Sequence, residues 1–576
     1  MLGHIRKFLP FAVIAMLFMA AEVLADLLLP DVMSRLIDEG ILGKGNGGVS
    51  SLPLVLKLGL EMAGIAVVGG LCGSLNNVFV NYASQNIGNG VRKDAFARIM
   101  EFSYPQVESF GTGSLITRLT NDITQIQNLV SQFIRGGVRT VLMLIGSLWF
   151  LFRLNAEFGW IVLAVTPFML ICVYLALKTV GPLFPVLQAQ LDKVNEVLQE
   201  DISGIRIIKA SVREAYERIR FGKANDALIG TQLRILFIYV LMNPAMNLLM
   251  SLAIVGILYE GSILSAEGAA TPGAVMAGIT YTGRLLISIL MLVMIFQTIT
   301  RGLASWRRVK EVTDAVPEMP GGTKTEGPGP RGSIEFRDVS FAYPDMALPV
   351  LEHVSFAVKP GESVAVMGAT GCGKTALVSL ISRFYDAGSG EVLVDGLNVR
   401  EFTRDALLSR VSIALQKSEL FAVSVADNIR WGKPGASEEE VAEAARIAQA
   451  DGFVRELPEG YATQVAEGGS GFSGGQRQRL SLARAVAKPA PILILDDATS
   501  ALDLRTEAAF YEALGQARRG QTRIIVAQRA ATARRADRIL VLDLGGVAGF
   551  GTHEELLKAC AAYREIWQSQ MGGRDE

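Results

Sequence analysis

The pattern of hydrophobic positions divides this chain into two parts that suit different solvents. Within the first 300 residues, six apolar stretches are about as long as the 20 or so residues that a helix needs to cross a bilayer. They cover residues 8–29, 62–91, 134–154, 158–177, 235–259 and 268–300. Two are weaker, because the first contains Glu22 and Asp26 and the third is apolar only between Arg139 and Arg153. We predict six transmembrane helices.

Two alternatives to membrane spans can be weighed. Buried core helices of a soluble protein would leave a 300-residue region with almost no surface. A secretory signal peptide could explain the first stretch alone, but no small-residue cleavage site is clear and the apolar run continues past the usual 7–15 or so residues. We therefore interpret residues 8–29 as a retained helix.

Basic residues in the connections predict the topology. The connections 83–133 and 178–234 are long and hold thirteen lysines and arginines. The other connections are short and hold Arg35 and Lys44, with Arg153 at the edge of a third. The positive-inside rule places both long connections and both termini in the cytosol. We expect the long connections to continue the membrane helices, each projecting roughly 30 Å for every twenty helical residues.

The second half of the chain has a different periodicity. Residues 313–332 are rich in Pro and Gly, which is typical of a linker. After them, short β-type runs alternate with helical stretches, a pattern that favours a mostly parallel α/β sheet. The runs are 333–341, 362–368, 391–396, 411–415, 491–497, 522–528 and 538–543. The predicted organisation is a six-helix membrane domain (1–312), a linker (313–332) and an α/β domain (333–576).

The amino-acid composition also indicates that part of the chain lies in a membrane. Half of the 576 residues are hydrophobic and 19% are charged, against about 25% in ordinary soluble domains. The formal net charge of −1 argues against a disordered chain and against recruitment to nucleic acid by bulk charge. Four widely spaced cysteines and three histidines indicate neither a disulfide framework nor a zinc site.

A glycine-rich turn carries the strongest chemical signal. Gly368-x-x-x-x-Gly373-Lys374-Thr375 follows a β-type run and opens a helical stretch, which is the context of a phosphate-binding loop. Glycines let backbone N–H groups surround phosphates at a helix N-terminus, where the dipole favours negative charge. Lys374 is placed to reach the β and γ phosphates, and the Thr375 hydroxyl to hold Mg²⁺. The predicted loop residues are Gly368, Thr370, Gly371, Cys372, Gly373, Lys374 and Thr375, with Cys372 a packing rather than a redox residue.

A flexible Gly-rich turn without a ligand is the alternative interpretation. The run 491–497 argues against it, because a buried strand that ends in Asp496 supplies a second group able to order magnesium. Between these motifs, Ser473-Gly474-Gly475-Gln476 stands at a helix start, 23 residues before Asp496. Its uncharged N–H donors form another anion site. One chain does not need two such sites for one nucleotide, whereas two chains facing head to tail do.

These motifs resemble those of the ATP-binding cassette (ABC) family, and the resemblance covers the whole chain in the order of half-size ABC exporters. It implies six transmembrane helices with long cytosolic extensions fused to an α/β P-loop nucleotide-binding domain. It also implies ATP and Mg²⁺ as cofactors and membrane lipid as the surroundings of the first domain. The short segments 106–111 and 212–220 resemble the coupling helices that dock on the cassettes.

The resemblance also implies roles for single residues outside the loop. Tyr343 resembles the aromatic residue that stacks on adenine, and Gln416 the residue that touches Mg²⁺ together with Thr375 and Asp496. Taken alone, Tyr343 is more typical of an ordinary strand aromatic and Gln416 of an exposed polar residue. Residues 465–471, with Glu467, resemble the X-loop, and residues 500–503, ending in Asp503, match the D-loop.

Two positions depart from the family pattern. Asp497 stands where a glutamate usually polarises the attacking water, and Gln528 where a histidine usually contacts the γ-phosphate. A shorter carboxylate loses about 1.5 Å of the reach that a general base needs, and a neutral amide cannot carry positive charge. We hypothesise that the site built on Lys374 binds ATP but hydrolyses it poorly. Harmless variation is the alternative.

The signature retains Ser473, Gly474, Gly475 and Gln476, with Phe472 in place of the usual leucine. This chain would therefore offer its partner an intact half-site, in which Ser473 and Gly475 assist catalysis. An intact signature beside changed Asp497 and Gln528 is what a heterodimeric exporter shows. The predicted partner is a different, related half-transporter that supplies the catalytic glutamate and histidine.

Charges inside spans usually face a cavity or each other. We expect Glu22, Asp26 and Arg284 to line a translocation cavity and to pair there; snorkelling, or pairing with the partner chain, is the alternative.

The leading functional prediction is an ATP-driven exporter of small amphipathic substrates, drugs or lipids, in a bacterial plasma membrane with its cassette in the cytosol. The alternatives are an ATP-gated channel or regulatory membrane protein, and a slow homodimeric exporter. An importer is disfavoured because the two parts are fused and no substrate-binding domain is visible. A soluble cassette ATPase is contradicted by the six spans.

Overall fold

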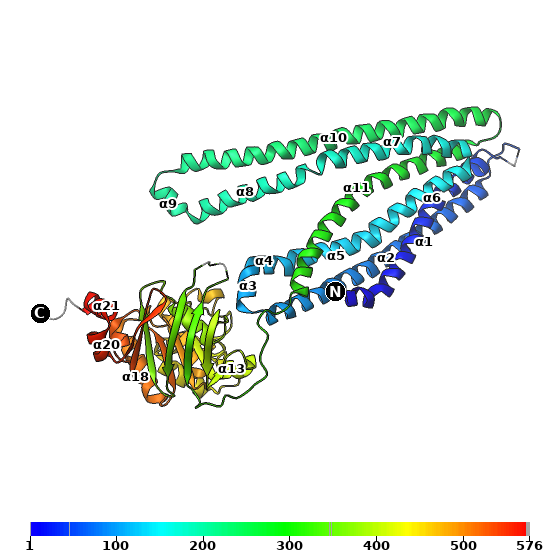
Figure 1. Ribbon diagram of the computed structural model, residues 1–576. Coiled ribbons are helices and arrows are strands. Elements are labelled where there is room, and N and C mark those ends of the chain that lie inside the picture. The colour runs from blue at the N-terminus through cyan, green and yellow to red at the C-terminus, as the bar shows by residue number, and fades with distance from the viewer. Residues whose placement is uncertain (1, 45–46, 345, 347, 572–576) are drawn as a thin grey trace. The chain divides into compact units, whose positions relative to one another are not determined.

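The computed structural model describes residues 2–44, 47–344, 346 and 348–571 (Figure 1). Contacts divide the chain into two compact units. The first unit comprises Met1–Met100 and Thr112–Ala315, and the second comprises Glu101–Gly111 and Val316–Glu576. The eleven residues from the last residue of α2 to Gly111 therefore pack with the second half of the chain, although the sequence groups them with the first.

The first unit is helical throughout its described secondary structure. Its α-helices are α1 (Leu2–Arg35), α2 (Leu52–Glu101), α4 (Thr112–Thr117), α5 (Ile123–Gln132), α6 (Val138–Leu154), α7 (Ala156–Val180), α8 (Leu183–Ser203), α9 (Ile205–Ala210), α10 (Glu214–Ala266) and α11 (Pro272–Asp314). Three π-helical segments, η1 (Leu36–Ile41), η2 (Arg118–Asp122) and η3 (Phe133–Gly137), continue or connect them.

Among the described residues, six helices or unbroken helical runs are long and apolar enough to cross a membrane. The extension of spans into the long connections is confirmed, because α2 is one helix of 50 residues and α10 one of 53. α10 runs beside α7 and α8, and α11 runs beside α5 and α6 (Figure 1). The short helix between α8 and α10 is α9, so it precedes the predicted segment 212–220, most of which begins α10.

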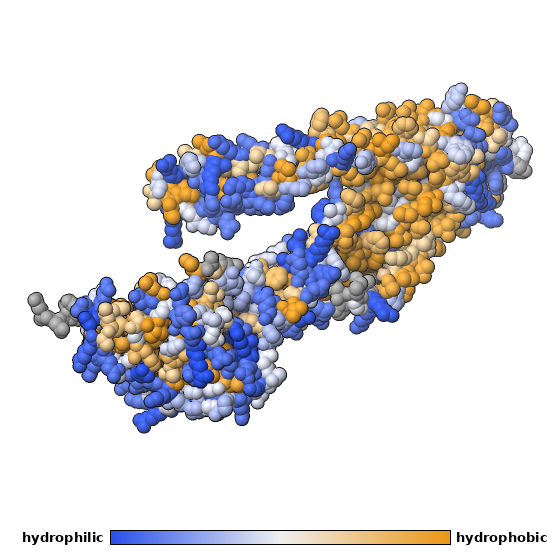
Figure 2. All heavy atoms as spheres, viewed as in Figure 1, coloured by the Kyte–Doolittle hydropathy of each residue, from blue (hydrophilic) through white to orange (hydrophobic). Residues whose placement is uncertain are grey.

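The surface of the first unit shows where it meets lipid. Hydrophobic residues gather over the spans, and hydrophilic ones over the helix ends (Figure 2). On α2, Leu60, Val67 and Val78 are 76%, 62% and 62% exposed. Apolar exposure repeated along a helix this long would be costly in water and is favourable in hydrocarbon. The chain is an integral membrane protein, as the sequence predicts.

The second unit contains two sheets in its described part. The strands are β1 (Ile334–Phe341), β2 (Leu351–Val358), β3 (Ser363–Gly368), β4 (Ser389–Val394), β5 (Leu397–Asn398), β6 (Val411–Ala414), β7 (Ile492–Asp496), β8 (Thr522–Val526), β9 (Arg538–Asp543) and β10 (Gly546–Gly551). A four-stranded antiparallel sheet has the order β2-β1-β4-β5. A six-stranded sheet has the order β10-β9-β3-β8-β7-β6, parallel except for β10.

The sequence predicts one mostly parallel sheet, and this holds only for the six-stranded one. The runs 333–341 and 391–396 instead form the antiparallel sheet as β1 and β4. They were misassigned because β2 was not recognised. Its backbone turns to a positive φ of 50° at His353, so its buried side chains alternate regularly only from Val354 to Val358. An alternation this short is a weak signal of period two.

Helices cover the sheets and form the short segments around them. They are α3 (Tyr104–Phe110), α12 (Lys374–Ile381), α13 (Arg404–Arg410), α14 (Val425–Arg430), α15 (Glu438–Ile447), α16 (Asp451–Arg455), α17 (Gly474–Ala487), α18 (Leu504–Ala517), α19 (Ala530–Ala533), α20 (His553–Ala559) and α21 (Ala561–Met571), with 3₁₀ turns η4 (Gly460–Ala462) and η5 (Glu467–Gly469). One core lies between the two sheets around α12, and another packs the opposite face of the parallel sheet against α15, α17, α18 and α21.

The Pro- and Gly-rich segment 313–332 is held against the second unit by Asp395. The buried Asp395 carboxylate accepts hydrogen bonds from the Gly332 N–H (2.6 Å) and from Arg410 Nε (2.7 Å). The Asp395 carbonyl accepts from the Gly329 N–H at 2.6 Å. One side chain thus joins the linker, the end of β4 and α13.

We predict that Asp395→Ala lowers the stability of the second unit by about 3–5 kcal/mol, because it leaves the Arg410 guanidinium buried without its carboxylate. Arg410 is 12% exposed. Asp395→Asn is the matched control, since it keeps an acceptor and tolerates the positive φ of 51° at this position. Thermal unfolding of the full-length chain in detergent measures the difference; equal melting of the two variants would contradict the prediction.

Candidate functional site

The turn between β3 and α12 is shaped by glycine. Gly368, Gly371 and Gly373 have φ values of 149°, 88° and 94°. A Cβ at Gly368 would lie 2.2 Å from the Leu542 carbonyl oxygen, and a Cβ at Gly373 would lie 2.6 Å from Leu351 Cδ2. Glycine is therefore required at both positions, and its freedom lets the loop amides face an anion at the start of α12.

Lys374 closes over this loop. Its Nζ donates hydrogen bonds to the carbonyls of Gly368 and Ala369, both at 2.8 Å, and lies 3.8 Å from Cys372 Sγ. Cys372 itself is buried and belongs to the core between the two sheets. Its thiol therefore packs in this core and remains within contact of the Lys374 ammonium.

A cavity of about 580 Å³ opens above the loop and collects most of the predicted nucleotide residues. Its lining includes Tyr343, Gly368, Thr370, Gly371, Gly373, Lys374, Thr375, Gln416, Asp496, Asp497 and Gln528. It also includes Met346, Val350, Ile566 and Gln570, which the motifs do not indicate. Ile566 and Gln570 come from α21, close to the end of the described chain, where no local pattern points to a ligand.

Thr375 and Asp496 form the polar floor of the cavity. Thr375 Oγ1 donates a hydrogen bond to Asp496 Oδ1 at 3.3 Å. Burial raises the pKa of Asp496 to about 6; the Thr375 hydrogen bond opposes this rise, the charge of Asp497 adds to it, and that of Lys374 opposes it. Hydroxyl and carboxylate oxygens are ligands that Mg²⁺ prefers. The residues of this loop and floor therefore fit a magnesium–nucleotide complex in both shape and donor chemistry.

Asp497 and Gln528, the two departures from the family pattern, bind each other. Gln528 Nε2 donates to Asp497 Oδ2 at 2.7 Å. Burial raises the pKa of Asp497, and hydrogen bonds from Ser500 and Gln528 with the positive charge of Lys374 oppose this rise. The Gln528 carbonyl in turn accepts from Gln570 Nε2 at 2.9 Å. The carboxylate is thus oriented towards an amide that α21 holds in place.

The signature segment lies apart from this cavity. Ser473 caps α17: its Oγ accepts from the Gln476 N–H at 3.2 Å, and Gln476 Oε1 accepts from the Ser473 N–H at 2.9 Å. Ser473 and Gly474 are exposed, and Gly475 and Gln476 are half-buried. None of the four lines the cavity above the loop. The loop and the signature, both predicted to contact ATP, are thus not brought together within the described part of one chain.

The D-loop, residues 500–503, is fixed at its start by α17. Gln478 Nε2 donates to Ser500 Oγ at 3.1 Å, and Gln478 Oε1 accepts from the Ala501 N–H at 2.8 Å. At its end, Asp503 caps α18 by accepting from the Thr506 N–H and hydroxyl at 2.9 and 2.7 Å. Asp503 also does not line the cavity.

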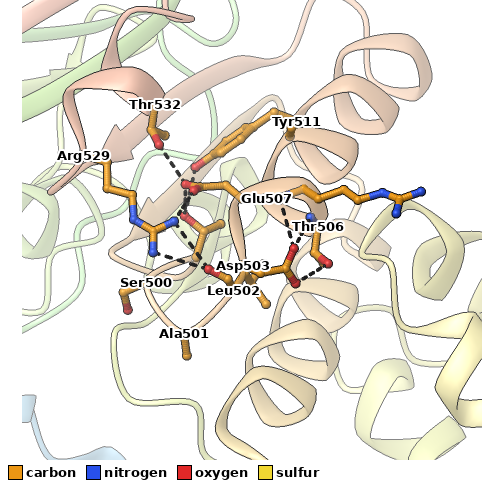
Figure 3. Close-up of polar contacts among 12 residues, drawn as sticks. Ser500, Ala501, Leu502, Asp503, Thr506, Glu507, Tyr511, Arg529 and Thr532 are labelled. Carbon is orange, nitrogen blue, oxygen red and sulfur yellow. Dashed lines mark hydrogen bonds and ion pairs between the residues drawn. The ribbon is translucent and has the colours of Figure 1, made fainter. Parts of the chain in front are cut away.

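Glu507 connects the D-loop region to the segment that carries Gln528. Figure 3 shows Arg529 and Thr532 converging on this buried carboxylate. It accepts from Arg529 Nη1, Thr532 Oγ1 and Thr499 Oγ1, each at 2.8 Å. The same guanidinium reaches the Leu502 carbonyl at 3.4 Å. Sequence reasoning missed Glu507, because a glutamate in a helix next to a motif is ordinarily a surface residue.

The segment around α3 packs on aromatic residues next to the cavity. Tyr385 Oη donates to Glu108 Oε2 at 2.8 Å, and Tyr104 lies edge-on to Tyr385 with ring centroids 5.6 Å apart. Tyr385 also lies edge-on to Tyr343, at 5.2 Å. Gln106 Nε2 donates to the Val316 carbonyl at 2.7 Å. The ring of Tyr385 therefore contacts both Tyr104 of α3 and Tyr343, the residue expected to stack on adenine.

Comparison with known proteins agrees with these features. Residues 12–290 match the family model described as ABC transporter transmembrane region, and residues 351–500 match the model described as ABC transporter. The chain is 36% identical to the uncharacterized ABC transporter ATP-binding protein YfiB of Bacillus subtilis, over 99% of this chain and 98% of that protein.

Two further relatives carry informative descriptions. An ATP-dependent lipid A-core flippase of Syntrophus aciditrophicus is 34% identical over 93% of this chain and 88% of that protein. The solved structure of a bacterial Atm1-family ABC exporter with ATP bound is 27% identical, with a TM-score of 0.81 over 98% of this chain and 99% of that one.

Tyr343→Ala is expected to weaken nucleotide binding roughly tenfold, because stacking of a base on an aromatic ring contributes about 1–3 kcal/mol. Tyr343→Phe should bind nearly as well as the native chain, since it keeps the ring. Titration of the full-length chain with a fluorescent ATP analogue and Mg²⁺ measures both. Equal affinities for the alanine and phenylalanine variants would show that the ring of Tyr343 does not stack on the base.

Glu507→Ala is expected to lower the free energy of unfolding by about 1–3 kcal/mol, because buried donors lose their shared acceptor. Glu512→Ala is the control on the same helix, since Glu512 is exposed. Thermal unfolding compares the two. A similar melting temperature for both would mean that the cluster around Glu507 contributes little.

Proposed function

This chain belongs to the ABC transporter family as a half-size exporter, and from that premise we propose that it moves small amphipathic molecules, drugs or lipids, out of the cytosol. Two features support the proposal: the spans are continuous with long cytosolic helices, and the second unit carries a loop and floor that fit ATP. A relative described as a lipid A-core flippase supports an amphipathic substrate. Export requires two global states whose balance ATP shifts.

Within this proposal, the chain's own residues hold the nucleotide. Tyr343 stacks on the base, the amides of the loop and Lys374 bind the phosphates, and Thr375, Gln416 and Asp496 hold Mg²⁺. The metal, when bound, neutralises phosphate charge and makes the terminal phosphoryl group easier to attack. The site is thereby equipped for binding.

Weak hydrolysis at this site is proposed on one observation, the 2.7 Å hydrogen bond between Gln528 and Asp497. A general base must come within about 2.6–3.2 Å of the proton that it removes. Asp497 is one methylene shorter than glutamate, and one of its two oxygens is already bonded to the amide. Gln528 cannot carry positive charge towards the phosphate, as a histidine can. Both changes act against the same step.

The partner is proposed to be a different, related half-transporter. The signature from Ser473 to Gln476 keeps its sequence and does not line its own chain's cavity, so it is free to complete a site on another chain. Such a partner would supply the catalytic glutamate and histidine that this chain lacks. The long-lived ATP at the site built on Lys374 would then keep the two cassettes in contact. A slow homodimer remains the alternative.

We predict that the purified chain alone hydrolyses ATP slowly and that Asp497→Glu with Gln528→His raises the rate at least tenfold. A positioned general base contributes about 10²–10⁴-fold. The same double change combined with Lys374→Ala should remain inactive, which assigns the gain to this site. Steady-state phosphate release measures all three. A brisk native rate that the double change leaves unaltered would overturn the degenerate site and favour the homodimer.

Transport is tested separately from hydrolysis. Inside-out vesicles that contain the chain and its partner should take up an amphipathic dye against its gradient when ATP is added. Uptake that stops at equilibrium across the membrane would instead indicate an ATP-gated channel. Vesicles with Lys374→Ala in this chain serve as the control for ATP binding.

A further inference from the structure

The first unit contains a cavity of about 760 Å³ that the motifs do not describe. It is lined from α1 by Asp26, from the run of α5, η3 and α6 by Arg135 and Arg139, and from α11 by Arg284 and Arg301. Four arginines and a single carboxylate thus face the same space. Charged side chains in or next to a membrane span are costly, and they usually pair with one another or line a substrate pathway. This cluster of arginines is therefore a candidate substrate site.

The carboxylates nearby pair with only one of these arginines. Arg139 donates to Glu22 and to Asp26, the second bond at 2.9 Å, so one arginine engages both acids. Arg284 donates to the backbone carbonyl of Asp26. The expected pairing of Arg284 with the acidic side chains is therefore made by Arg139 instead. Even with Glu22 included, two positive charges remain in excess around the cavity.

The two excess positive charges are those of Arg135 and Arg301. Both are exposed, and no ion pair engages either of them within the described residues. The polar contact of Arg301 is a 3.5 Å approach to Gln297 Oε1. A guanidinium is a planar donor suited to carboxylate and phosphate oxygens. These two side chains are consequently available to an anion.

The rest of the lining combines polar residues with a group of apolar ones. Met143, Ile287, Met291, Met294 and Ile295 share the cavity with the arginines. Methionine side chains are unbranched and adapt to irregular hydrocarbon shapes. The cavity therefore offers an acyl chain or ring system a surface next to the positive charges.

The basic positions also extend along the direction of transport. Arg284 lies 12 residues after the start of α11, about 18 Å along a helix whose membrane part needs about 30 Å to cross a hydrocarbon core. Arg301 lies 17 residues further, about 25 Å along the helix towards the cytosolic side. An anionic group would meet positive charge both at the cytosolic entrance and near the middle of the span.

We propose that the substrate of this exporter is an anionic amphipath, whose phosphate or carboxylate group is bound by Arg135 and Arg301 and then passes to Arg139 and Arg284. The inference rests on the proposed export function and narrows its substrate class. A hydrophobic cation is repelled by the two excess charges, because the acidic side chains that could attract it are occupied by Arg139.

The test uses the full-length transporter in phosphatidylcholine proteoliposomes. The probes are fluorescent phosphatidic acid and fluorescent phosphatidylcholine with the same acyl chains, and the competitor is soluble glycerol phosphate. The native protein should bind phosphatidic acid at least tenfold more tightly. Arg135→Gln with Arg301→Gln should weaken that binding roughly tenfold and leave phosphatidylcholine unchanged. Arg307→Gln, an exposed arginine of α11 outside the cavity, is the control.

The outcomes separate this inference from the export function. Equal binding of the two lipids, or an equal effect of Arg307→Gln, overturns the anionic site. Competition by glycerol phosphate as strong as by phosphatidic acid overturns an amphipathic ligand in favour of a soluble anion. Restoration of binding by Arg135→Lys with Arg301→Lys supports the role of charge and excludes misfolding. Selective binding without ATP-dependent translocation would leave the site intact and reject export.

Discussion

A backbone that leaves water must satisfy its own hydrogen bonds, and this constraint shapes the first unit. Helix is the one secondary structure that does so without a neighbouring strand, so a chain that enters the bilayer as helix can leave it as helix. α2 and α10 continue in this way, with 50 and 53 residues and no break. Rigid elements of this length give a membrane cavity and a cytosolic end a common mechanical support. The proposed coupling of ATP binding to transport depends on that continuity.

Much of the fold could be predicted from the sequence because its signals are local. Six long apolar stretches identify the spans, and a glycine-rich turn after a buried strand identifies the loop at Gly368. The failures have physical causes. β2 was missed because His353 interrupts its alternation, and without β2 the antiparallel sheet could not be recognised.

In the candidate site, too, residues that belong to local motifs could be predicted and residues placed by tertiary packing could not. Most of the residues contributed by motifs lie together in one cavity, from Tyr343 to Gln528, whereas the signature and Asp503 do not line it. Those contributed by tertiary packing could not be predicted: Gln570 reaches the cavity from α21, and Glu507 joins segments that no local pattern connects. Arg139 replaced Arg284 as the partner of the acidic residues, because the helical faces that meet depend on how α1, α6 and α11 pack.

The position of α21 has a consequence for pharmacology. Ligands that imitate ATP tend to bind many related ATPases, because loop amides and a magnesium floor offer similar contacts in each. Ile566 and Gln570 contact the same cavity but lie outside the motifs that carry the family resemblance. A compound that reaches these two side chains as well as the loop would depend on contacts outside the motifs that such ATPases share.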